Sequence, residues 1–213
     1  MTRLDRLARG LTAAGAVVIL LGLGVEVWHA YSHDAAVEAL TPFLSLSYEA
    51  NLPTWYAASL LLACAIVLGL IACDAGAPLR RYWWGLAIMF GYMSLDESAE
   101  LHERLGGLVG TGGVLYFDWV IPAAIIVGAI GLIYLPFLRR LPAATRRHFV
   151  VAGAIYVTGA LLMELPLGWW TERAGADNLT YALIDWVEES LEITGATWFL
   201  TALIAYRAEA RPA

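Results

Sequence analysis

The chain has 213 residues, of which 60% are hydrophobic and 15% charged, whereas about a quarter of a typical soluble domain is charged. Its formal net charge is −6 and all thirteen of its basic residues are arginines, so no basic face suits a nucleic acid. These figures exclude an ordinary soluble domain and a nucleic-acid-binding protein, and they favour a membrane protein.

Six apolar stretches follow one another along the chain, and each is long enough to cross about 30 Å of hydrocarbon. They lie near residues 11–33, 53–73, 82–104, 115–137, 148–170 and 179–206. We interpret the first stretch as a retained membrane helix, not as a cleaved signal peptide. The connecting segments are too short for a separate soluble domain. We therefore predict a single all-α domain over residues 1–213, a polytopic membrane protein with six transmembrane helices in a bundle.

The arginines predict how these helices are oriented. Eleven of the thirteen fall before the first stretch, after the last, or in the second and fourth connections. Only Arg104 and Arg173 fall on the other side. Because cytoplasmic loops are enriched in basic residues, this pattern predicts that both termini are cytoplasmic, in a bacterial inner (plasma) membrane.

Acidic residues show the opposite distribution, and most of them belong to the outer half of the predicted bundle. They fall on helical stripes, at offsets of three, four or seven residues that put side chains on one face. The first stretch carries Glu26, His29 and His33; the third Asp96, Glu97, Glu100 and Glu103; the fifth Glu164; and the sixth Asp185, Glu188, Glu189 and Glu192. With a rise of about 1.5 Å per residue from the nearest arginine, four helices place carboxylates in one slab roughly 22–28 Å above the cytoplasmic side.

A bound metal ion is the most specific explanation for this layer of carboxylates. Charged side chains inside a membrane are costly, and several carboxylates in one place also repel each other. Helices that each contribute a glutamate, some with Glu-x-x-His, are typical of di-iron and di-manganese bundles. We predict one or two divalent ions, with Fe, Mn or Zn favoured and Mg or Ca as alternatives. The predicted ligands are Glu26, His29, Glu97, Glu100, Glu164, Glu189 and Glu192, with His33, Asp96, Glu103, Asp185 and Glu188 in an outer layer.

Three functions are compatible with such a site. The first is a metal-dependent membrane oxidoreductase or hydrolase that acts on a lipid or a small apolar substrate. The second is a transporter or channel for protons or divalent cations, and the third is a structural subunit of a membrane complex. Polar groups are scarce in the inner halves of the helices, which favours a one-sided pocket and hence an enzyme. The sequence indicates membrane lipid as a partner, and it assigns no catalytic residue, organic cofactor or oligomeric state.

Several local patterns lead to further expectations. The strings DESAE at 96–100 and EESLE at 188–192 suggest a weak internal repeat. Cys64 and Cys73 share one apolar stretch and are expected to be unpaired. Pro166 is expected to distort the fifth helix near Glu164. The glycines of residues 106–113 predict an external loop.

Tryptophans are expected to anchor the helices at the two membrane interfaces. The candidate anchors are Trp83, Trp84, Trp119, Trp169 and Trp170.

Overall fold

The computed structural model describes residues 3–32, 34–102 and 110–210, which form helices and connecting turns without a strand. The all-α prediction is therefore confirmed. The elements are α1 (Arg3–Tyr31), α2 (Ala35–Leu44), α3 (Leu52–Asp74), α4 (Leu79–Ala99), η2 (Gly113–Leu115), α5 (Val120–Arg140), α6 (Ala143–Val157), η3 (Thr158–Met163), α7 (Glu164–Ala174) and α8 (Leu179–Ala210).

Four helical segments are long and apolar enough to cross a membrane: Leu4–Tyr31, Leu52–Asp74, Val120–Arg140 and Ala143–Ala174. The last of these is the continuous run of α6, η3 and α7. Helices α4 and α8 have 21 and 32 residues, but they are not apolar enough to belong to this set. The composition of the described helices thus supports a membrane protein with four candidate spans.

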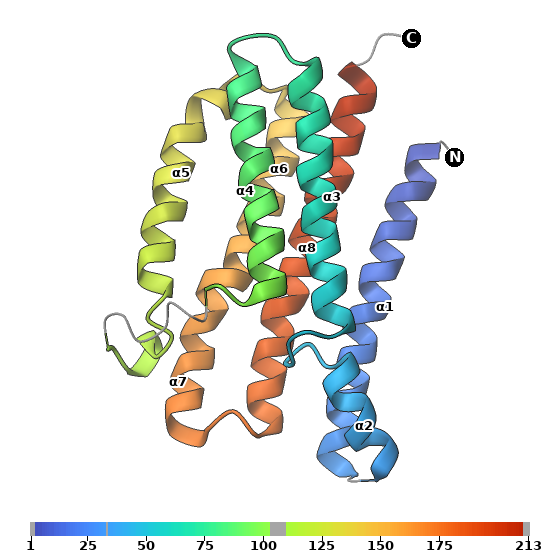
Figure 1. Cartoon of the computed structure of the whole chain (residues 1–213), viewed down its shortest axis with the longest axis vertical. Helices are drawn as coiled ribbons and strands as arrows, with labels where there is room; N and C mark the ends of the chain where they lie inside the picture. The colour runs from blue at the N-terminus through green and yellow to red at the C-terminus, as the bar shows by residue number, and fades with distance from the viewer. Residues whose placement is uncertain (1–2, 33, 103–109, 211–213) are drawn as a thin grey trace.

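The long helices form an elongated bundle in which both chain termini lie at the same end (Figure 1). Helix α8 packs against α1, α3, α6 and η3, while α4 packs along α3. Helix α5 stands at the edge of the bundle and exposes Ile125, Leu132 and Ile133. An apolar outer face of this kind is what a helix presents to lipid.

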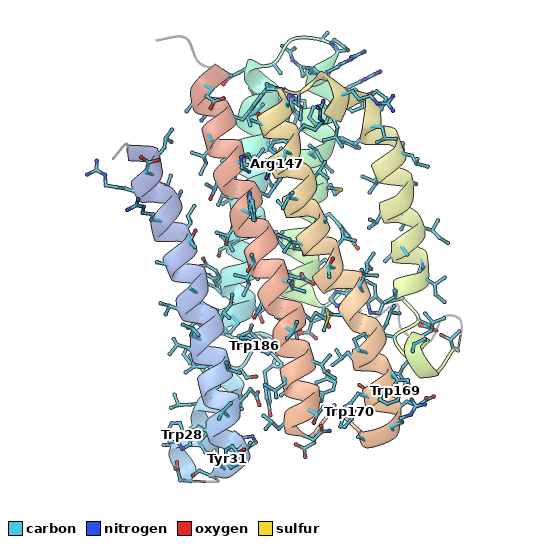
Figure 2. The ribbon with its side chains drawn as sticks, turned by 180° about the vertical axis from the view of Figure 1, so that it is seen from behind. Trp28, Tyr31, Arg147, Trp169, Trp170 and Trp186 are labelled. Atoms are coloured by element: carbon cyan, nitrogen blue, oxygen red, sulfur yellow. The ribbon has the colours of Figure 1, made fainter. Side chains whose placement is uncertain are left out.

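Aromatic side chains gather at the end opposite the termini. Figure 2 shows Trp28, Tyr31, Trp169 and Trp170 at that end, whereas Arg147 lies near the end that carries both termini. Trp28 and Trp169 are each 41% exposed. This placement fits the membrane-interface role expected of Trp169 and Trp170.

Trp83 has a different role from the interface anchor that its sequence position suggested. Its side chain is fully buried, and its ring lies 4.7 Å from that of Phe137 and 5.1 Å from that of Tyr206. Phe149 also packs edge-on against it. Trp83 therefore joins α4, α5, α6 and α8 near the arginine-rich end, while its neighbour Trp84 is 42% exposed.

Several predicted boundaries are wrong. The stretch predicted as 82–104 ends early, because α4 stops at Ala99 and Glu100 adopts a left-handed conformation with φ 51° and ψ 44°. No glycine or proline marks this end in the sequence. The stretch predicted as 115–137 begins late, because a 3₁₀ turn precedes α5. Helix α2 was not predicted, since it is short and follows α1 closely.

Helix α2 begins at an aspartate that caps its amino end. One oxygen of Asp34 accepts hydrogen bonds from the amides of Ala36 and Val37, each 3.0 Å long, and the other accepts one from Ser32. These bonds favour the charged carboxylate, so the pKa of Asp34 lies below its ordinary value of 3.8, chiefly because of the Val37 amide. The cap fixes the point at which the chain reverses after α1.

We expect Asp34→Ala to speed amide hydrogen exchange at Ala36 and Val37, and Asp34→Asn to preserve most of the protection. Because folding lowers this pKa, the wild-type cap is fully present above the ordinary value of 3.8 and is lost as the pH falls through the lower folded value. Exchange measured by NMR or mass spectrometry, corrected for intrinsic rates, checks this. Equal protection in the Ala variant would contradict the cap.

A π-helix, η3, interrupts the long helix formed by α6 and α7 immediately before Glu164. Proline at position 166 cannot donate a hydrogen bond to the carbonyl four residues earlier, and π turns relieve such breaks. The distortion predicted near Pro166 is therefore present one turn earlier. Short π segments often occur at functional sites.

Candidate functional site

A set of acidic side chains from α4, α7 and α8 lies close enough together to interact electrostatically, and we call it the carboxylate cluster. Its members are Asp96 and Glu97 on α4, Glu164 at the start of α7, and Asp185, Glu188, Glu189 and Glu192 on α8. Glu49, from the segment before α3, interacts with Glu97 and Glu192. The structure thus brings together most of the acids on the predicted stripes of the third, fifth and sixth stretches.

Two glycines allow the helix that precedes Glu164 to approach α8 backbone to backbone. A Cβ atom added to Gly159 in η3 would lie 2.7 Å from the carbonyl oxygen of Glu188 and 2.9 Å from Cγ of Glu192. One added to Gly195 would lie 2.8 Å from the backbone nitrogen of Tyr156. All three distances are shorter than a real Cβ atom shows, so the packing at the cluster depends on these glycines.

Tyr156, on α6, is a member of the site that the sequence did not indicate. Its side chain interacts electrostatically with the carboxylates of Glu192, Glu97 and Glu189. No acidic stripe points to a tyrosine two turns before Glu164. The close approach of small residues on α6 and α8 is the sequence signal that could have indicated it.

The cluster has little basic countercharge in the part of the chain that the structure describes. His102 lies beside it, with its Nδ1 atom 3.0 Å from an oxygen of Asp96. Glu188 is only 7% exposed, and its Oε2 atom has no hydrogen-bond partner among the described residues. A buried carboxylate of this kind is compensated by a proton or by a bound cation.

Glu26 and His29, which the sequence placed in the same slab, face a different part of the molecule. Glu26 is 6% exposed and accepts a hydrogen bond from the hydroxyl of Ser45. His29 has its Nε2 atom 3.5 Å from a carboxylate oxygen of Glu38 on α2. Because α1 packs against α2 as well as α8, this stripe contacts α2 and Ser45, the residue that follows it.

The remaining predicted site residues are placed as follows. Glu100 follows the end of α4 in its left-handed conformation, so it does not continue the stripe that begins at Asp96. His33 and Glu103 lie outside the described residues. Over residues 3–32, 34–102 and 110–210, no group of three or more His, Cys, Asp or Glu side chains is arranged to hold a metal ion. Cys64 and Cys73 are unpaired, as expected.

Residues 10–206 match the model of a family described as a domain of unknown function (DUF8692). The chain belongs to this family. The match includes the carboxylate cluster, Tyr156, both packing glycines and the Glu26 stripe. No curated protein and no solved structure matches the chain.

Proposed function

We propose that this member of the family is an integral protein of a bacterial inner membrane with six transmembrane helices and cytoplasmic termini. Helices α4 and α8 are the two additional spans, since they pack lengthwise against candidate spans α1, α3 and α6. Both termini lie at one end of the bundle, with Arg147 nearby (Figures 1 and 2). Basic residues favour the cytoplasmic side, so this arrangement supports the proposed orientation.

We propose further that the carboxylate cluster binds a divalent metal ion. The observation that carries this proposal is the buried Glu188 oxygen that lacks a partner while its side chain interacts with Glu164, Asp185 and Glu192. A divalent cation would offset two of these charges at once. Glutamate has three rotatable side-chain bonds, and a change of rotamer is what would bring ligands from α4, α7 and α8 onto one ion. Oxygen ligands favour Fe²⁺, Mn²⁺, Mg²⁺ or Ca²⁺, and a nearby His102 admits Zn²⁺.

The packing in the inner half of the bundle supports a site that opens only toward the outer side. Leu68, Leu203 and Trp83 are completely buried there, and Phe149 and Phe199 stack beside them with ring centroids 4.7 Å apart. Among the described residues, these side chains fill the interior toward the arginine-rich end with apolar packing. It supports an enzyme or binding site entered from the outer side over a transport path.

An enzyme of this kind would act on a lipid or a small apolar substrate. When bound, the metal would supply a Lewis acid for activating water or oxygen. Tyr156 would donate a hydrogen bond from its hydroxyl group to Glu192 and so orient that carboxylate, while the packed glycines hold α6 against α8. The reaction would belong to the oxidoreductases or the hydrolases.

Elemental analysis by mass spectrometry tests the metal site on protein purified in mild detergent without chelators. We expect one or two equivalents of a divalent metal in the wild type and at least a tenfold loss in the double variant Glu189→Gln, Glu192→Gln, because neutral amides replace two ligand oxygens. Glu209→Gln, at the exposed end of α8, is the matched control and should keep its metal. Unchanged melting temperatures in both variants would show that the fold persists.

Absence of metal even after reconstitution with Fe, Mn, Zn, Mg and Ca would overturn this proposal. It would favour the second candidate, movement of protons or divalent cations. The neighbouring carboxylates of α7 and α8 support that candidate, because carboxylates that interact with one another can share a proton. Proteoliposomes loaded with a pH-sensitive dye would then reveal proton flux that the same double variant abolishes.

A further inference from the structure

Three pairs of arginines lie at the end of the bundle that carries both chain termini, and we call them the arginine cluster. One pair lies at the start of α4, one at the end of α5 and one in the first two turns of α6. Figure 1 shows these three helix ends at that end of the bundle, and Figure 2 labels Arg147 there. The members of the cluster are Arg80, Arg81, Arg139, Arg140, Arg146 and Arg147, and all but Arg146 are exposed.

Aromatic side chains next to the three pairs hold the helix ends together. Tyr82 follows the pair on α4, Phe137 lies two residues before the pair on α5, and Phe149 lies two residues after the pair on α6. The ring of Phe137 lies 5.4 Å from that of Tyr82 and 4.7 Å from that of Trp83. The ring of Phe149 lies 6.1 Å from that of Trp83. The fold therefore brings the three arginine pairs to one part of the surface.

The guanidinium group of Arg81 is positioned where α4 meets α5. Its central carbon lies 5.1 Å from the centre of the Tyr82 ring, within the range of a cation–π contact. That ring packs edge-on against Tyr134 of α5 at 5.5 Å, and the Tyr134 hydroxyl donates a hydrogen bond of 3.1 Å to the carbonyl of Tyr82. An oriented guanidinium can bind a phosphate through two parallel N–H donors.

The segments that carry the arginine cluster contain no acidic residue. The sequence has no Asp or Glu over residues 75–95 or over residues 119–163. Asp74, the acid just before the first of these segments, lies 3.7 Å from the guanidinium of Arg207 on α8. Six positive charges from three helices are thus gathered without a carboxylate from their own segments, and such a surface attracts anions.

Exposed apolar side chains continue from the arginines along the outside of α4 and α5. On α4, Trp84 and Ile88 follow Arg81 at offsets of three and seven residues, which places all three on one face. On α5, Ile133 lies seven residues before Arg140 and is likewise exposed. Tryptophan is typical of the membrane interface. A surface that passes from arginine through tryptophan to isoleucine matches the head group, interface and acyl chains of a lipid, whereas a soluble anion would contact only its first part.

We propose that the arginine cluster binds the head group of an anionic phospholipid in the leaflet at this end of the bundle. Arg81 and Arg140 pair with its phosphate group, and its acyl chains lie along the exposed faces of α4 and α5. Clusters of basic side chains next to membrane helices bind anionic lipids in this way. The proposal rests on the proposed membrane placement of the bundle, and it requires neither a metal ion nor a particular orientation of the termini.

Native mass spectrometry tests this proposal on the full-length protein, in detergent micelles that contain equal amounts of phosphatidylglycerol and phosphatidylethanolamine. The test variant is Arg81→Gln with Arg140→Gln. The matched control is Arg6→Gln with Arg9→Gln, which removes two exposed arginines from α1 at the same end of the bundle. Both variants lose the same net charge, and only the test variant loses the proposed site. Melting temperatures without added lipid show whether each is folded, and the single variants Arg81→Gln and Arg140→Gln replace a double variant that is not.

We expect the wild type to retain phosphatidylglycerol over phosphatidylethanolamine, and the test variant to lose roughly fivefold in this preference for each arginine removed. The control should keep the preference. Equal retention of the two lipids by the wild type overturns the proposal, even if calorimetry detects binding of inorganic phosphate. An equal loss in the test variant and the control also overturns it, because net charge alone would then explain the binding. Resistance of the protein to alkaline extraction from membranes tests the membrane placement separately, so the two failures are distinguishable.

Discussion

Replacing either packing glycine is expected to destabilise the bundle at the carboxylate cluster. In Gly159→Ala the new methyl group would meet the backbone oxygen of Glu188 at 2.7 Å, and in Gly195→Ala it would meet the backbone of Tyr156 and Ala152 at 2.8 and 2.9 Å. Backbone atoms cannot move aside as a flexible side chain can. We expect each change to cost about 1–3 kcal/mol, the usual cost of overpacking.

Thermal unfolding in detergent, followed by circular dichroism or intrinsic fluorescence, measures this effect. Gly153→Ala is the matched control, because Gly153 lies on α6, in the same continuous helical run as Gly159, and a Cβ there meets nothing within 4 Å. Alanine is the better helix former by roughly 0.5–1 kcal/mol, so the control should melt at the same or a higher temperature. If all three variants melted alike, α6 and α8 would not be in backbone contact.

Trp83→Ala is expected to have the largest effect of any single truncation in the apolar half. Trp83 is completely buried among the rings of Phe137, Phe149 and Tyr206. Removing such a side chain costs roughly 3–5 kcal/mol, because the neighbours cannot close the cavity. In a membrane the loss comes from packing, since lipid is as apolar as the protein interior.

Two further variants show that packing is responsible. Trp84→Ala removes the same kind of side chain from a position that is 42% exposed, and it should cost less than half as much. Trp83→Phe should be milder than Trp83→Ala, because the indole nitrogen of Trp83 has no hydrogen-bond partner within the described residues. Unfolding in increasing concentrations of denaturing detergent ranks the three. A Trp84 variant as unstable as the Trp83 variant would disprove the packing argument.

The helical fold follows from sequence because apolar stretches long enough to span a bilayer leave few alternatives. The second predicted stretch, 53–73, differs from α3 by one residue at each end. The third stretch fails at Glu100 because its end is set by a left-handed residue that carries a side chain, not by glycine or proline. Helix ends of this kind depend on tertiary contacts that periodicity does not encode.

The acids of the site were predictable from helical stripes, but which stripes face one another was not. Offsets along one helix correctly put Asp185 and Glu189 on a common face. Whether two helices turn those faces toward each other depends on rotation and packing, which the sequence does not specify. The carboxylate of Glu26 lies against Ser45, because α2 packs on that side of α1. Tyr156 was not predicted, because its place in the site depends on the close approach of α6 and α8 at Gly195.

The direction in which Glu164 points depends on the exact number of residues in the π-helix before it. Each residue of a regular helix turns the following side chains by about 100°. Removing one residue from Thr158–Met163 would allow a regular α-helix there, and it would rotate Glu164 and the rest of α7 by roughly that angle relative to α6. Relatives whose chains differ in length at this point would then keep the bundle while Glu164 no longer faced Glu188. Among relatives, the length of this segment would therefore distinguish proteins that retain the carboxylate cluster from proteins that share only the helical bundle.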